Sequence, residues 1–276
     1  MSQEEYFQFV QALALELNRE EIALTSFPDV VIRVRKALDD PDVTPVVLGN
    51  VLSVDPVLAS RILVLANSSH YNRGSLKVDS LDAAVGRIGF DTVRKTAIAY
   101  AVEQLHAAKG LKALKKELSQ AWSGSLRLAA MSEVIAQTYG DLDGDSAFIA
   151  GLVNQIGVLY IFSKYDEYPN LLQDPDARQK LVEEWTAPIS DSIVSNWKFS
   201  RAIQASVNPD DDEASRRGTN ANLADVVRVA KVALNGAADE ACESAEARRL
   251  QLTSEQMPDI MTAYKDKLDT LASAVR

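Results

Sequence analysis

The chain has 276 residues and a net charge of −10, with 47% hydrophobic and 25% charged residues. This balance excludes global disorder, and the acidic charge argues against a broad nucleic-acid footprint or binding to an anionic membrane surface. The single cysteine, Cys242, excludes an internal disulfide, and two histidines, His70 and His106, are too few for a site that needs three imidazoles. The acidic start has no apolar run behind a basic patch, so we expect no signal peptide and a cytoplasmic location.

Apolar residues recur at helical spacing through the first hundred residues, and no segment there has a convincing strand pattern. Thr44-Pro45 and Asp55-Pro56 each place an N-cap residue before a proline at the first helical position, which predicts two short helices that meet at a corner. Residues 67–77 are small and polar and predict a loop, after which Asp79 or Ser80 caps the next helix. The apolar stripes run through residues 6–17, 30–37, 47–54, 58–65 and 93–100.

A second helical block begins after Gly110. Its most apolar segment, Ala147 to Phe162, is interrupted by Asn154 and Gln155 and predicts a single central helix that neighbours cover on every face. The segment is too short for a comfortable membrane span. Together the two blocks predict an all-α protein.

The common chemical motifs are missing from the sequence. It has no phosphate-binding GxxxxGK[ST] loop, no GxGxxG fingerprint, no HExxH, no paired CxxC and no GxSxG nucleophile elbow. We therefore expect no catalytic residue from these classes and no cofactor.

A family resemblance rests on three strings in the first block. They are Ser53–Leu58 (SVDPVL), Arg61–Ser68 (RILVLANS) and Arg87–Arg94 (RIGFDTVR). The stretch from Leu24 to Gln104 resembles the HDOD domain, an HD-related output domain of bacterial signalling proteins. The resemblance implies an HD-like multi-helix bundle in two closely packed helical subdomains.

On this basis we divide the chain into four consecutive parts. They are an N-terminal helix (1–20), an N-terminal HDOD subdomain (21–110), a degenerate HD-like subdomain (111–236) and a C-terminal helical extension (237–276).

In metal-dependent HD phosphohydrolases, the second half supplies a histidine, a His-Asp doublet and a distal aspartate to a metal ion. The resemblance places Gly124, Asn154, Gln155 and Lys231 at these positions, and Thr186 where a further histidine would stand. Glycine offers no donor, the amides are neutral, and a lysine ammonium repels a cation. The resemblance therefore implies vacated ligand positions, no bound metal and no catalysis.

The function expected from the resemblance is that of a non-catalytic signal-transduction module. It would act through protein–protein contacts with an unidentified signalling partner, and not on nucleic acid or a membrane. Three alternatives remain open: a sensor of a nucleotide or other anion held by Lys231 and Arg228, a residual metal-dependent phosphohydrolase, and a homodimer formed through an end helix.

The polar loop and its neighbours are the candidate contact surface. The alternative is a structural role, in which Asn67 caps a helix and Tyr71 fills a core. The candidate binding residues are Arg61, Asn67, His70, Tyr71, Arg73 and Arg94.

Overall fold

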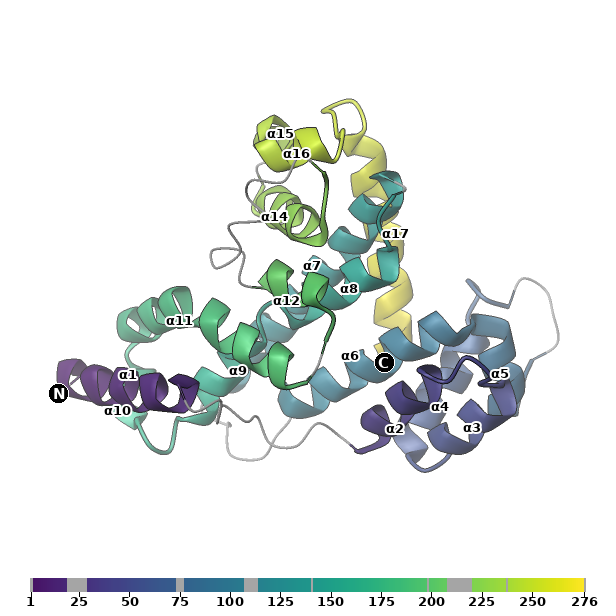
Figure 1. The fold of residues 1–276 in the computed structure, drawn as a ribbon, viewed down its shortest axis with the longest axis horizontal. Coiled ribbons are helices and arrows are strands. Elements are labelled where there is room, and N and C mark those ends of the chain that lie inside the picture. Colours follow the sequence, from purple (N-terminus) through teal and green to yellow (C-terminus); the bar gives the residue numbers. More distant parts are fainter. Residues whose placement is uncertain are drawn as a thin grey trace. The chain divides into compact units, whose positions relative to one another are not determined.

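The computed structural model describes residues 2–18, 29–72, 77–106, 114–139, 141–197, 199–207, 220–236 and 238–275. Every regular element in these ranges is a helix, which confirms the all-α prediction (Figure 1). The chain divides into two compact units. The larger unit contains residues 1–25 and 105–261, and the smaller unit contains residues 26–104 and 262–276. The N-terminal helix thus groups with the second half of the sequence, and the C-terminal helix contributes to both units.

The smaller unit is a bundle of short helices around an aliphatic core. Helix α3 packs on α2 and α5, and α4 packs on α5. Ser80, one of the two expected cap residues, caps α5. The helices are α2 (Asp29–Leu38), α3 (Pro45–Leu52), α4 (Pro56–Ala66), α5 (Leu81–Ile88) and α6 (Phe90–His106).

Side-chain caps set the corner between α3 and α4. Thr44 caps α3, and one carboxylate oxygen of Asp55 accepts hydrogen bonds from the N–H groups of Val57 (2.9 Å) and Leu58 (3.0 Å). The other oxygen accepts the hydroxyl of Tyr100 on α6 at 2.9 Å. Burial and this hydrogen bond raise the pKa of Tyr100 to about 12. Asp55 therefore joins the start of α4 to α6, which explains why an aspartate stands before Pro56.

The larger unit is built around α7, which packs along α8, while α14 contacts α7, α8 and α12 (Figure 1). Gly151 permits the close approach of α8 to α7, because a Cβ there would lie 2.7 Å from the carbonyl oxygen of Leu128. The helices are α1 (Ser2–Asn18), α7 (Lys115–Tyr139), α8 (Gly144–Val153), α9 (Ile156–Ser163), α10 (Pro169–Gln173), α11 (Pro175–Asn196), α12 (Arg201–Val207), α14 (Leu223–Leu234), α15 (Ala238–Glu243), α16 (Ala245–Arg249) and the first turn of α17 (Met257–Val275).

The prediction of one continuous helix from Ala147 to Phe162 is wrong. The helix breaks at Asn154 and Gln155, which lie between α8 and α9. By length and composition, Gly144–Ser163 is the one stretch in the described ranges that could cross a membrane, but 83% of the window tested is buried within the protein. Its apolar character is accounted for by its place in the core of the larger unit.

Helix α1 packs against α10 and α11 of its own chain. Phe9 and Leu13 are buried, and Glu16 accepts hydrogen bonds from the hydroxyl of Tyr160 and from Lys164, the latter at 3.1 Å. Burial and the bond to Glu16 raise the pKa of Tyr160 well above its usual value. For this end helix, packing on its own chain is what the structure shows.

Candidate functional site

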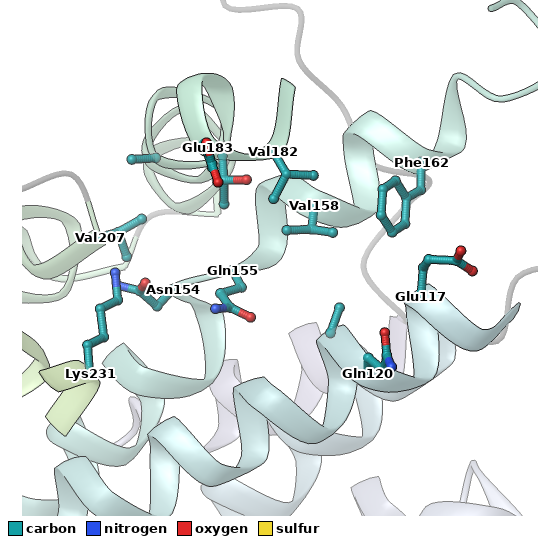
Figure 2. Close-up of a pocket in the computed structure, with 13 residues that line it drawn as sticks. Glu117, Gln120, Asn154, Gln155, Val158, Phe162, Val182, Glu183, Val207 and Lys231 are labelled. Atoms are coloured by element: carbon teal, nitrogen blue, oxygen red, sulfur yellow. The ribbon is translucent and has the colours of Figure 1, made fainter. Parts of the chain in front are cut away.

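In the larger unit, a pocket of about 450 Å³ lies between α7, the α8–α9 break, α11 and α14 (Figure 2). In Figure 2 Lys231 extends from one side toward Asn154, and Glu117 and Gln120 lie on the other side of Gln155. The lining residues are Glu117, Gln120, Ala121, Asn154, Gln155, Val158, Phe162, Val182, Glu183, Thr186, Ala187, Val207 and Lys231.

A second pocket of about 320 Å³ adjoins the first, because Gln155 and Lys231 line both. Its wall comes from α7 and from the end of α14. We call the two pockets together the Lys231 site. The smaller pocket is lined by Gly124, Arg127, Leu128, Gln155, Lys231, Leu234 and Asn235.

The helix break at the floor of the site is held by a side chain of one helix and a backbone carbonyl of another. The Ser190 hydroxyl on α11 accepts the N–H of Gly157 at 2.8 Å and donates to the carbonyl oxygen of Asn154 at 3.2 Å. The Asn154 amide nitrogen donates to the carbonyl oxygen of Ser206 on α12 at 3.1 Å. Asn154 is therefore buried with partners, as a polar group in an apolar core requires. Gln155 is half-buried and forms part of both pocket walls.

Lys231 is the one cation among the described residues that line the larger pocket. Its side chain remains accessible from the pockets, although many protein atoms surround it. This burial lowers the pKa of Lys231 below its usual value, and the nearby charge of Arg228 lowers it further. Within the described ranges, no hydrogen bond or ion pair joins Lys231 to another residue, whereas Arg228 is paired with Glu246 at 3.0 Å.

Two carboxylates, Glu117 and Glu183, also line the larger pocket. Glu117 forms an ion pair with Arg178 at 3.2 Å, and Glu183 accepts a hydrogen bond from Gln179 at 2.8 Å. The walls between these acids and Lys231 are mostly apolar, from α9 and α11. The larger pocket therefore combines one cation, two carboxylates and apolar wall residues.

All five positions that the sequence singled out as vacated metal ligands line the Lys231 site: Gly124, Asn154, Gln155, Thr186 and Lys231. The residues present do not fit a divalent ion. These five residues supply no imidazole and no carboxylate, and no group of three or more His, Cys, Asp or Glu side chains in the described ranges could hold a metal ion. The Gln155 side chain occupies part of the space beside Gly124, since a Cβ there would lie 3.3 Å from its Oε1.

Sequence reasoning missed Glu117, Gln120, Arg127 and Glu183. A signal for three of them was present, because Glu117 and Gln120 precede Gly124 by seven and four residues and Arg127 follows it by three. These spacings place them on the helix face that carries Gly124. Glu183 stands three residues before Thr186 and follows the same rule.

The candidate contact surface in the smaller unit is not one cluster. Arg61 pairs with Glu103, and its guanidinium lies 5.3 Å from the centre of the Tyr100 ring. Arg94 instead pairs with Asp91 at 3.4 Å. The two acids stand twelve residues apart on α6, about 18 Å along the helix axis, so the two arginines occupy different parts of the unit.

The loop residues divide between structure and exposure. Asn67 caps α4, and its side chain accepts from the N–H of Val78 (2.9 Å) and donates to its carbonyl (2.7 Å), which closes the loop. Tyr71 is half-buried, with its hydroxyl 3.4 Å from that of Thr92, while His70 is exposed against the edge of the Tyr71 ring. Arg73 lies outside the described residues.

The HDOD domain profile matches residues 24–212, more than half of the chain. The chain belongs to the HDOD domain family. This confirms the resemblance seen in the three strings of the first block. The profile extends past that block into the larger unit, where the Lys231 site lies.

Solved structures support the same fold. A protein of Shewanella amazonensis SB2B, provisionally named a metal-dependent phosphohydrolase, matches with a TM-score of 0.80 and 22% identity over 98% of this chain and 99% of that one. An HDOD domain protein of unknown function from Geobacter sulfurreducens matches with a TM-score of 0.61 and 22% identity, over 95% of this chain and 94% of that one. A protein of Marinobacter aquaeolei VT8, provisionally named a signal transduction protein, matches with a TM-score of 0.65 and 19% identity, over 92% of this chain and 60% of that one. At these identities the likeness shows the fold alone.

One curated relative is an uncharacterized protein of Treponema pallidum. It is 26% identical over 175 residues, which cover 63% of this chain and 32% of the relative. The matched part thus spans about a third of that protein's length.

Proposed function

We propose that this HDOD protein is a non-catalytic signalling module of the bacterial cytoplasm that acts through contacts with a partner protein. Membership of the HDOD family supports the signalling role, as does the likeness to the Marinobacter protein named for signal transduction. The observation that carries the non-catalytic part is the chemistry of the Lys231 site. Where an HD phosphohydrolase needs imidazole and carboxylate donors, the pocket presents Gly124, two neutral amides, Thr186 and a lysine.

The likeness to the Shewanella protein named as a phosphohydrolase makes hydrolysis the second candidate function. It is disfavoured by electrostatics, because a lysine ammonium within a few ångströms of a divalent ion repels it and the surrounding apolar walls weaken solvent screening. Two carboxylates do line the pocket, but Glu117 is already neutralised by Arg178.

The non-catalytic proposal predicts no chelator-sensitive turnover. The purified chain is incubated with phosphate monoesters, phosphodiesters and cyclic dinucleotides in the presence of Mn²⁺ or Mg²⁺, with and without EDTA. We expect product formation no faster than in a matched blank, because the five vacated positions offer no imidazole or carboxylate to hold the ion that would activate water. Turnover that EDTA abolishes and that co-purifies with the protein would contradict the proposal.

The partner-contact proposal predicts a selective effect of charge reversal in the polar loop. Arg73→Glu should leave the far-UV circular dichroism and Tm unchanged but weaken partner capture from the native cell about tenfold, since reversing a surface charge opposes electrostatic association. Lys265→Glu, an exposed lysine on α17, is the matched control and should capture the partner as the unchanged protein does. Equal capture by Arg73→Glu and the unchanged protein would discard this surface.

A further inference from the structure

The smaller pocket of the Lys231 site has the chemistry of an anion site. Two cations, Lys231 and Arg127, line it together with the amides of Gln155 and Asn235, and no carboxylate is among its described lining residues. Ammonium, guanidinium and amide N–H groups are all donors, and a set of such donors suits a dianion with several acceptor oxygens. The larger pocket, which shares Lys231 and Gln155, provides space for whatever is attached to that anion.

The larger pocket is suited to hold the organic part of a small-molecule ligand. Its volume of about 450 Å³ falls within the usual range of small-molecule pockets, and its walls include Val158, Phe162 and Val182. Glu117, which lies on the other side of Gln155 from Lys231 (Figure 2), and Glu183 present carboxylate oxygens that accept hydrogen bonds from amino or hydroxyl groups.

We propose that the Lys231 site binds a phosphorylated small molecule of the class of nucleoside monophosphates. Lys231, Arg127 and the Gln155 amide bind the phosphate, and the larger pocket holds the organic part with its hydrogen-bond donors toward Glu117 and Glu183. The site binds this ligand without cleaving it. The inference adds a ligand to the proposed signalling module and is tested by binding rather than by turnover.

Two features of the Lys231 site support a ligand. Lys231 lines both pockets and has no ion-pair partner in the described ranges, and burial together with the charge of Arg228 lowers its pKa. An anion supplies a counter-charge to the ammonium. The hydroxyl oxygen of Thr186, on the wall of the larger pocket, is buried without a hydrogen-bond partner among the described residues. A buried polar atom without a partner is costly, and a ligand that bonds to it removes that cost.

The test compares binding of chosen probes to the full chain. AMP and phenyl phosphate at millimolar concentration are expected to raise the Tm by about 2–5 °C, the shift that a ligand at 10 to 100 times its Kd produces in a chain of this size. Inorganic phosphate should give a smaller shift because it leaves the apolar pocket unfilled. Adenosine and phenol should give none because they lack the anion. Isothermal titration calorimetry on the same probes gives the Kd.

Lysine variants assign the effect to the site. Lys231→Met should fold with a Tm equal to or slightly above that of the unchanged protein, because it removes a disfavoured charge, and it should lose the response to AMP. Lys231→Arg should retain part of the Tm shift that AMP produces. Lys265→Met, whose lysine lines neither pocket, should retain all of that shift.

Three results would overturn the proposal: no shift with any phosphorylated probe, an equal shift in Lys231→Met, or an equal shift with phenylacetate, which carries a carboxylate instead of a phosphate. None of these results bears on chelator-sensitive turnover, so failure here is distinct from failure of the non-catalytic proposal.

Discussion

Replacing Arg249 by methionine is expected to lower the free energy of unfolding by about 3–5 kcal/mol. Asp225 on α14 is 1% exposed, and both of its carboxylate oxygens accept hydrogen bonds from the Arg249 guanidinium, with Nε 3.0 Å from Oδ2. Methionine keeps much of the side-chain volume but leaves the Asp225 charge buried without its counter-charge. Asp225 also forms a capping box with Asn222, so the same loss weakens the start of the helix that carries Lys231.

Urea unfolding followed by tryptophan fluorescence measures this effect, because Trp122, Trp185 and Trp197 all belong to the larger unit. Arg248→Met is the matched control, since that exposed arginine bonds to the carbonyl of Glu243 and should cost less than about 0.5 kcal/mol.

The double variant Asp225→Asn with Arg249→Met should recover part of the loss, because it removes the stranded charge. A cost for Arg249→Met no larger than for Arg248→Met would show that the ion pair does not hold α14 in place.

Replacing Gly157 by valine is expected to lower the free energy of unfolding by about 3 kcal/mol or more. A Cβ at this position would lie 2.4 Å from the carbonyl oxygen of Thr186 and 2.9 Å from the hydroxyl oxygen of Ser190. The nearer atom is backbone of α11 and cannot rotate away, so α9 and α11 must separate. Their separation would also disrupt the Ser190 bridge across the helix break and open the Lys231 site.

Gly86→Ala is the matched glycine control. No heavy atom lies within 4 Å of a Cβ built at Gly86 in α5, so alanine should raise the free energy of unfolding by about 0.5–1 kcal/mol through its better helix propensity. Circular dichroism at 222 nm during urea unfolding reports both variants. Overpacking a core typically costs about 1–3 kcal/mol. If the free energy of unfolding of Gly157→Val lies within about 1 kcal/mol of that of the unchanged protein, the two helices can move apart at little cost.

Local features of the fold were predictable because their signals lie within one helical turn. Thr44 and Asp55 cap the helices that follow them, as their places before a proline indicated. Asn67 also caps α4, which was the structural alternative for that residue. Each of these interactions joins groups at most a few residues apart, so the sequence alone carries the information.

The break between α8 and α9 was not predictable in the same way. Asn154 and Gln155 were visible as a polar interruption, but the apolar pattern on both sides is that of one helix. The break is held by Ser190 and Ser206, which stand 36 and 52 residues further along the chain than Asn154. Their contribution depends on how α11 and α12 pack, which no local spacing encodes.

By itself, the sequence determined the helical class, the caps and the family, and it singled out the five positions where the resemblance implies that metal ligands are missing. Only the tertiary structure decided that these positions line two adjoining pockets, that Arg127 and the carboxylates of Glu117 and Glu183 share them, and that α1 packs on the larger unit. The physical reason is the separation along the chain of the residues that interact. A cap or an amphipathic stripe is set by neighbours along one helix, whereas the charges of a pocket come from helices brought together by burial of their apolar faces.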